Sequence, residues 1–95
     1  MKFRDMNSNQ QTAFTQVVHA SNWIVGGYEN SIQDGELDVM PSRAQLIDEI
    51  YWTVTHCFCQ EGMIASMEVP EVRFAGKKFI MERIEKRLDK WGITE

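Results

Sequence analysis

The hydrophobic residues in the first third of the chain recur every three or four positions. From Phe14 to Ile32 they fall within an arc of about 120° when the chain is wound at about 100° per residue, which is typical of one face of a helix. Ser8 and Gln11 have the spacing of a capping box, in which each side chain satisfies a backbone N–H at the open helix end. We therefore predict a first helix over about residues 9–33.

Gly26 and Gly27 interrupt this helical pattern. Each glycine costs roughly 1 kcal/mol inside a helix relative to alanine, which favours a helix end at this point. The apolar stripe nevertheless continues to Ile32, just before the next stop signal at Gly35. If the helix runs on, the glycine pair forms either a weak joint or a notch where another backbone comes close.

Two further helices are predicted, over about residues 43–61 and 71–91. Ser42 precedes the second helix, and Gly62 supplies its stop. Pro70 lies where the third would begin, and Gly76 marks a point where this helix can break. The apolar stripes of the two helices comprise Leu46, Ile47, Ile50, Tyr51, Val54, Cys57 and Phe58, and then Ile80, Ile84, Leu88 and Trp91.

No run of residues alternates apolar and polar side chains convincingly, so no sheet is predicted. The sequence thus predicts an all-α fold, a small bundle of three helices or of four. A chain of 95 residues is expected to form a single domain, here 1–95 with a flexible N-terminus of about 7 residues.

The composition is that of an ordinary soluble domain, with 43% hydrophobic and 25% charged residues. No apolar run is long enough to span a bilayer, and no apolar stretch follows the N-terminal charges as it would in a secretory signal. We expect a cytoplasmic protein that does not enter a membrane. Cys57 and Cys59 are then expected to be free thiols.

Charge is distributed unevenly along the chain. Between Glu29 and Glu71 there are nine acidic residues and one arginine, Arg43, whereas seven of the ten basic residues lie between Arg73 and Lys90. The acidic middle and the basic tail can pair within one chain or between chains, and the sequence leaves both open. The acidic connector between the first two helices has no base near it; it comprises Glu29, Asp34, Glu36 and Asp38.

Candidate chemistry is sparse. The acidic connector partly resembles a calcium-binding loop, but Ile32 and Pro41 would occupy positions that must supply oxygen ligands. His56, Cys57 and Cys59 would fan around a helix instead of converging on one metal ion. No motif for phosphate binding or nucleophilic catalysis is present. We therefore expect no metal, no cofactor and no enzymatic activity.

The basic tail offers one alternative function, nucleic-acid binding through the C-terminal helix. Its acidic residues Glu82, Glu85 and Asp89 and the sequence pI near 5.1 argue against that reading. The bases that would carry it are Arg73, Lys77, Lys78, Arg83, Lys86, Arg87 and Lys90.

Two tryptophans are displaced from the predicted core faces. Trp52 lies nearly opposite the stripe of the second helix, and Trp23 lies well to one side of the stripe of the first. Tryptophan is enriched at binding hot spots, so both are candidate interface anchors. The neighbours that would share the interface are His19, Asp48 and Thr55. The alternative is that a segment such as 63–69 covers one tryptophan, or that a helix is packed on two sides.

These observations favour a small non-catalytic protein–protein interaction domain, most simply a homodimer that buries the outward tryptophans. An accessory or inhibitor protein of a phage or mobile element would suit such a chain, although no particular residue indicates that setting.

Overall fold

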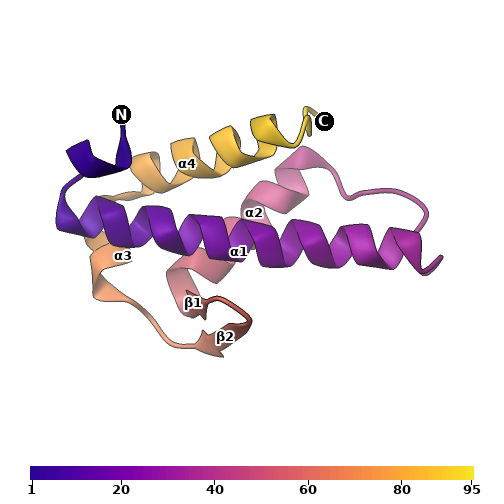
Figure 1. Cartoon of the computed structure of the whole chain (residues 1–95), viewed down its shortest axis with the longest axis horizontal. Helices are drawn as coiled ribbons and strands as arrows, with labels where there is room; N and C mark the ends of the chain where they lie inside the picture. The colour runs from indigo at the N-terminus through magenta and orange to yellow at the C-terminus, as the bar shows by residue number, and fades with distance from the viewer.

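The computed structural model describes all 95 residues as one helical body with a small hairpin. The helices are α1 (Ser8–Gln33), α2 (Arg43–His56), α3 (Pro70–Ala75) and α4 (Lys77–Lys90), and the strands are β1 (Cys57–Gln60) and β2 (Met63–Ser66). The long α1 lies across the molecule, with α4 running alongside it in the same direction and α2 crossing behind (Figure 1). None of the helices combines the length and the apolar content that crossing a bilayer requires.

The predicted first helix is confirmed, and Gly26 and Gly27 lie inside it. The capping box at its start is one residue earlier than predicted. Asn7, not Ser8, accepts from the backbone N–H of Gln10 at 2.8 Å, and the Gln10 side chain accepts from the Asn7 N–H at 3.0 Å. Both residue pairs have the required spacing, which is why the sequence pattern did not separate them. Before the cap, residues 3–5 form a short 3₁₀ turn and Met6 is buried.

The prediction of a second helix reaching residue 61 is wrong, because α2 ends at His56 and the chain turns into a β-hairpin. β1 and β2 pair antiparallel, with Gln60 opposite Met63 and Gly62 in the tight turn at a φ of 75°. Thr53, Val54 and Thr55 in the last turn of α2 are β-branched and Phe58 in β1 is aromatic, and these residue types lower the preference for helix and favour extended backbone. The hairpin also corrects the expectation of a fold without a sheet.

The predicted third helix is divided in two at Gly76. This residue has a φ of 91° and a ψ of 148°, a backbone conformation that is open essentially only to glycine. Pro70 occupies the first turn of α3 as predicted, and α4 ends at Lys90 just before Gly92. The molecule therefore has four helices, and it is mostly helical without being a pure helical bundle.

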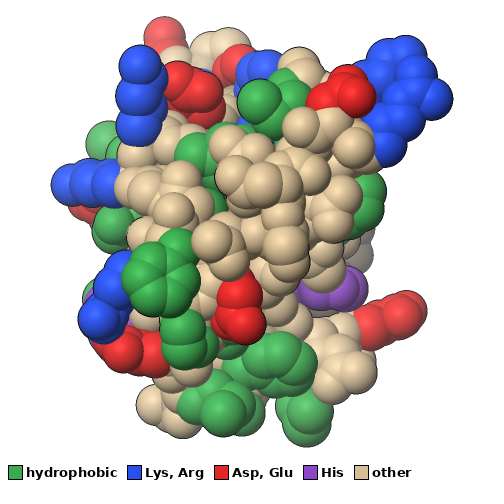
Figure 2. Space-filling model, turned by 90° about the vertical axis from the view of Figure 1, so that its left-hand side faces the viewer, with side chains coloured by type: hydrophobic (Ala, Val, Ile, Leu, Met, Phe, Trp, Pro, Cys, Tyr) green, Lys and Arg blue, Asp and Glu red, His purple; other side chains and the backbone are tan.

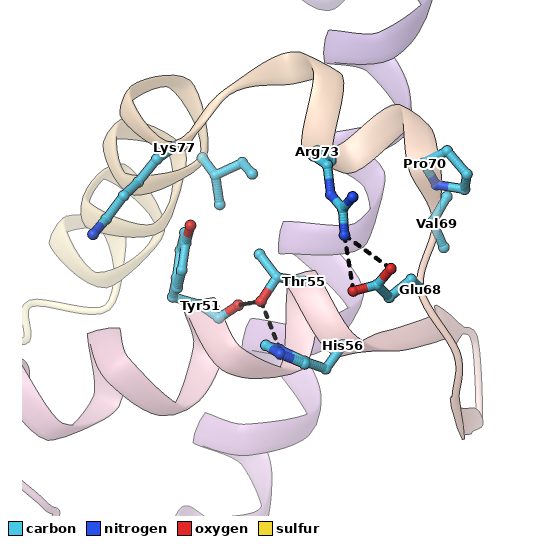
Figure 3. A pocket seen from close by; sticks show the side chains of 9 residues that line it. Tyr51, Thr55, His56, Glu68, Val69, Pro70, Arg73 and Lys77 are labelled. Carbon is cyan, nitrogen blue, oxygen red and sulfur yellow. Dashed lines mark hydrogen bonds and ion pairs between the residues drawn. The ribbon is translucent and has the colours of Figure 1, made fainter.

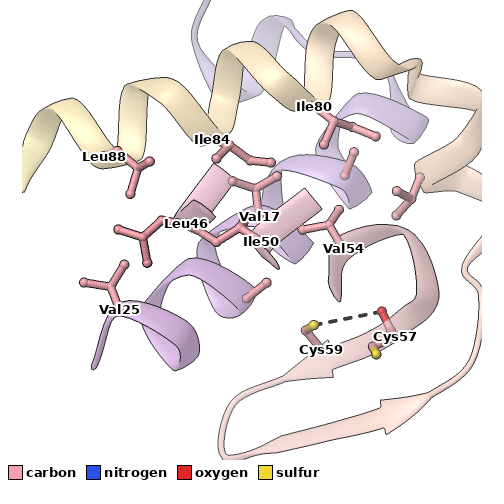
Figure 4. Packing of buried hydrophobic residues seen from close by; sticks show 13 residues of the cluster. Val17, Val25, Leu46, Ile50, Val54, Cys57, Cys59, Ile80, Ile84 and Leu88 are labelled. Atoms are coloured by element: carbon pink, nitrogen blue, oxygen red, sulfur yellow. Dashed lines mark hydrogen bonds between the residues drawn. The ribbon is translucent and has the colours of Figure 1, made fainter. Parts of the chain in front are cut away.

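A single hydrophobic core lies between α1, α2 and α4 and is closed at one end by β1 and α3 (Figure 4). The apolar stripes predicted for α2 and α4 supply Leu46, Ile50 and Val54, and Ile80, Ile84 and Leu88. The other members of the cluster are Ala13, Val17, Ala20, Val25, Cys57, Cys59 and Val72.

One buried polar side chain joins the hairpin to α1. Gln16 is only 4% exposed, and its amide donates to the Cys59 carbonyl at 2.9 Å while its carbonyl accepts from the Cys59 N–H at 2.7 Å. The side chain thus pairs with β1 much as a neighbouring strand would. An isolated two-stranded hairpin is marginally stable in water, so this contact together with the two buried cysteines holds the hairpin on the core.

Candidate functional site

Trp23 lies on the outer side of α1 and is 55% exposed. Three shallow hollows surround its ring. One, of about 350 Å³, lies toward α2 and Glu49; one, of about 240 Å³, lies toward the hairpin turn and His19. The third, of about 420 Å³, runs along α1 over Gly26 and Gly27. The hairpin thus borders Trp23 without covering it, so the residues 63–69 do not form the lid considered from the sequence.

Neither the backbone conformation nor the packing of the fold requires glycine at positions 26 and 27 of α1. A Cβ built on Gly26 or Gly27 would meet no atom within 4 Å beyond the helix's own backbone and the chain neighbours, and neither residue has a positive φ. Alanine would fit at both positions and would favour the helix by up to roughly 1 kcal/mol each. The chain therefore keeps a bare strip of backbone beside an exposed tryptophan.

Trp52 is equally exposed, at 57%, but its surroundings differ. Its ring stacks on the imidazole of His56, with 4.7 Å between the ring centroids and an interplanar angle of 9°. Asp48 is exposed on the same helix, and Thr55 is half-buried. No hollow is lined by both tryptophans, so the predicted interface residues divide between a Trp23 surface with His19 on α1 and a Trp52 surface with Asp48 and Thr55 on α2.

The acidic connector remains free of bases. Glu29, Asp34, Glu36 and Asp38 are all exposed, and none takes part in either of the two ion pairs of the molecule. Those pairs join Arg43 to Asp89 at 2.9 Å and Arg73 to Glu68 at 3.0 Å. The acidic connector therefore does not pair with the basic tail inside one chain.

Most bases of the tail are engaged locally. Arg83 lies 5.2 Å from the ring centroid of Phe79, and Arg87 lies 4.8 Å from that of Trp91. Arg87 also donates to Asn22 on α1 at 2.5 Å, and Arg73 is held by Glu68. Only three of the seven predicted nucleic-acid-binding bases lack any such partner: Lys78, Lys86 and Lys90.

A deeper pocket of about 400 Å³ lies where α2, α3 and α4 meet (Figure 3). The sequence did not predict it, because its residues come from four separate segments. Tyr51, Thr55 and His56 line it from α2, and Lys77 and Ile80 from α4. The remaining wall comes from α3 and the segment before it, and comprises Glu68, Val69, Pro70 and Arg73.

Two groups have perturbed proton affinities. Burial, together with the charge of Cys57, raises the pKa of the Cys59 thiol from 9.0 to about 11. The hydrogen bond to Glu49 raises the pKa of Tyr28, whose hydroxyl lies 2.7 and 2.8 Å from the two carboxylate oxygens. Both cysteines are free and buried, and they share the inward face of β1 because strand residues two apart point the same way. No three His, Cys, Asp or Glu side chains come together as potential metal ligands.

Comparison with protein-family models, curated proteins and solved structures gave no match to this chain.

Proposed function

We propose that this protein is a non-catalytic interaction domain that self-associates through the outer face of α1, with Trp23 as the anchor. The main observation behind the proposal is that Trp23 is exposed and lies beside Gly26 and Gly27, where the absence of side chains leaves the helix backbone uncovered. A tryptophan that is exposed to water in the monomer stabilises a complex when a partner covers its ring. Glycines in a helix let a second backbone approach closely. Because Trp52 already has a ring partner in His56, we place the anchor at Trp23.

If two α1 helices pack antiparallel about a two-fold axis, both copies bury this surface. Trp23 lies about one helical turn from Gly27, so two outer faces that cross midway between these residues set the tryptophan of each copy against the glycines of the other. The two-fold axis makes the surface self-complementary, because each copy supplies both a ring and a notch.

Charge supports the same arrangement. Beyond the crossing, the acidic connector of one copy extends along the first half of the other α1. The C-terminal part of α4 lies beside the middle of α1, where Arg87 donates to Asn22 and where Lys86 and Lys90 are exposed and without partners. The unpaired acids of one copy and the unpaired bases of the other would thus attract each other as two copies approach.

The test is the molar mass in solution, measured by sedimentation equilibrium at low and high salt. We expect a dimer whose dissociation constant rises with salt, and we expect Trp23→Ala to be monomeric with unchanged helix content. Trp52→Ala is the matched control, because it removes an equally exposed tryptophan and should leave the dimer intact. A monomeric wild-type protein at tens of micromolar, or equal weakening by the two variants, would sink the proposal.

Nucleic-acid binding by α4 is the less well supported alternative, because local contacts already engage Arg83 and Arg87. It predicts salt-sensitive binding of DNA or RNA that is lost when Lys78, Lys86 and Lys90 are reversed in charge.

A further inference from the structure

The two edges of the β-hairpin differ in how their backbone groups are satisfied. On the β1 edge, the Gln16 side chain bonds both the N–H and the C=O of Cys59. Cys59 lies directly opposite Ile64, and because its own groups point outward, the two residues exchange no hydrogen bonds across the hairpin. The N–H and C=O of Ile64 therefore point away from β1, to the free edge of β2.

Ser66 repeats this arrangement two residues further along β2. It lies opposite Cys57, whose N–H points out of the hairpin to the Thr53 carbonyl of α2. None of the backbone hydrogen bonds outside the helices and the hairpin involves Ile64 or Ser66. β2 packs mainly against β1 and lies at the rim of the molecule (Figure 1). The free edge thus presents the N–H and C=O groups of both residues to solvent, at the spacing of a strand.

This edge lacks the features that usually keep a free strand from pairing. From Met63 to Ser66 it has no charged residue and no proline, and it pairs with β1 residue for residue without a bulge. Met63 and Ala65 point to the face opposite the buried cysteines, and Met67 follows the strand. The two methionines are 50% and 55% exposed. A strand along this edge would satisfy the backbone groups and cover apolar side chains at once.

The charge around the hairpin indicates the character of such a strand. Residues 57–71 include three glutamates, Glu61, Glu68 and Glu71, and no lysine or arginine. Arg73 holds Glu68, whereas Glu61 and Glu71 are exposed and form no ion pair. A segment with basic residues at its ends would complement these carboxylates.

We propose that β2 is a docking edge for an extended segment of a partner protein, which adds to the hairpin as a third, antiparallel strand. The segment has apolar side chains at alternate positions, on the same face as Met63 and Ala65, and a basic residue at each end. Hydrogen bonds with Ile64 and Ser66 set its register, and the apolar side chains give specificity. The proposal goes beyond self-association through Trp23 and depends on different groups, so either can fail alone.

The probe is the peptide acetyl-Lys-Val-Thr-Val-Thr-Val-Lys-amide, titrated into the ¹⁵N-labelled full chain. With its central valine opposite Ala65, its two threonines exchange hydrogen bonds with Ile64 and Ser66. In the free protein, the amide of Ala65 should be protected from hydrogen exchange, and those of Ile64 and Ser66 should not be. On binding we expect saturable shifts and slower exchange at Ile64 and Ser66.

Two N-methylated peptides separate backbone pairing from side-chain contact. Methyl groups on both threonine nitrogens remove the donors that face β2 and should weaken binding by at least about tenfold. Methyl groups on the last two valine nitrogens, which face away from β2, are the matched control and should have little effect. Replacing both lysines of the peptide by glutamate should also weaken binding, because the hairpin is acidic.

Ser66→Pro makes the corresponding change in the protein. Proline is tolerated on an edge strand where its nitrogen faces solvent, so the hairpin should keep its bonds between β1 and β2. The loss of the N–H and the added ring should weaken binding of the unmethylated peptide by at least about tenfold. Ser66→Ala is the control, since it keeps the N–H and should bind as the wild type does. Both variants are also measured with Trp23→Ala, which removes the proposed dimer.

The proposal is overturned if no saturable shifts occur at millimolar peptide, if the two N-methylated peptides bind equally, or if Ser66→Pro and Ser66→Ala bind equally. It is also overturned if Ile64 and Ser66 are already protected in the free protein. Should that protection grow with protein concentration and disappear in Ser66→Pro, a second copy of this chain occupies the edge in place of a partner protein.

Discussion

The two halves of α1 belong to the same helix but have different roles. The first half, 8–21, carries Ala13, Gln16 and Val17 into the core and against β1, while α4 runs alongside. The second half, 22–33, buries one apolar residue fully, Val25, and extends beyond α4 to the acidic connector (Figure 1). A hydrogen bond from Tyr28 to Glu49 is its main polar tie to α2.

This difference teaches where a small domain keeps its stability and where it has surface left for a partner. Residues in the first half are fixed by many buried neighbours, so their chemistry is dictated by the fold. In the second half, no buried neighbour constrains Trp23, Gly26 or Gly27, so the packing of the fold does not explain why these residue types are present. Figure 2, which views the end of the molecule where α1 begins, shows hydrophobic side chains interrupted by charged ones there.

The largest expected effect concerns the first half. Gln16→Leu should lower the free energy of unfolding by roughly 3 kcal/mol, because it leaves the buried N–H and C=O of Cys59 without partners. Urea unfolding at a fixed protein concentration measures this loss, and amide exchange at Cys59 should accelerate with it. The control is Gln11→Leu, which removes a bond to the Phe3 carbonyl at the surface and should cost well under half as much. Equal costs would mean that the hairpin does not depend on Gln16.

The buried Cys59 thiol makes stability sensitive to alkaline pH. Because burial raises the pKa of Cys59 from 9.0 to about 11, the folded state holds this proton when the unfolded chain has already lost it. The contribution is complete below pH 9 and is lost as pH rises toward 11, a total of roughly 2–3 kcal/mol. Urea unfolding between these pH values should show a downward slope that becomes shallower in Cys59→Ala, where only the raised pKa of Tyr28 remains, and that persists in Cys57→Ala. The same slope in all three proteins would contradict the burial of the Cys59 thiol.

The sequence predicted the elements whose signals are local. Capping spacing and apolar stripes located the starts of α1 and α2 and the inward residues Leu46, Ile50 and Ile84. The hairpin was missed because all three residues from Cys57 to Cys59 are apolar, so the strand shows no alternation, and Val54, Cys57 and Phe58 have helical spacing. The sequence placed both tryptophans off the core faces from their angle to the stripe but left open whether another segment covers one of them; in the structure both are exposed.

What remained out of reach depends on contacts between distant segments. Gln16 and Cys59 are 43 residues apart, and the sequence around each contains no signal that the two residues form hydrogen bonds with each other. The α2–α3–α4 pocket likewise exists only because Gly76 turns the chain and brings α3 and α4 against Tyr51 and His56. Sequence patterns report the period of one element, whereas these features are set by how elements pack together.

The smallest expected effect concerns the second half of α1, where one substitution should raise the stability of the monomer and weaken the dimer. Gly26→Ala and Gly27→Ala should each raise the stability of the monomer by up to roughly 1 kcal/mol, because alanine restricts the unfolded chain and its methyl group meets nothing within 4 Å. The same methyl would separate the two backbones at the proposed crossing, so the dissociation constant of the dimer should rise by about tenfold. Unfolding of dilute protein and sedimentation equilibrium measure the two effects separately.

The contrasting glycine is Gly76, whose φ of 91° alanine adopts poorly, so Gly76→Ala should lower stability without a direct effect on the dimer. If the two α1 variants instead gained stability and kept the dimer unchanged, the glycine pair would serve no contact between copies. The difference between the two halves of α1 would then be one of packing alone, and the case for Trp23 as an anchor would rest on its exposure only.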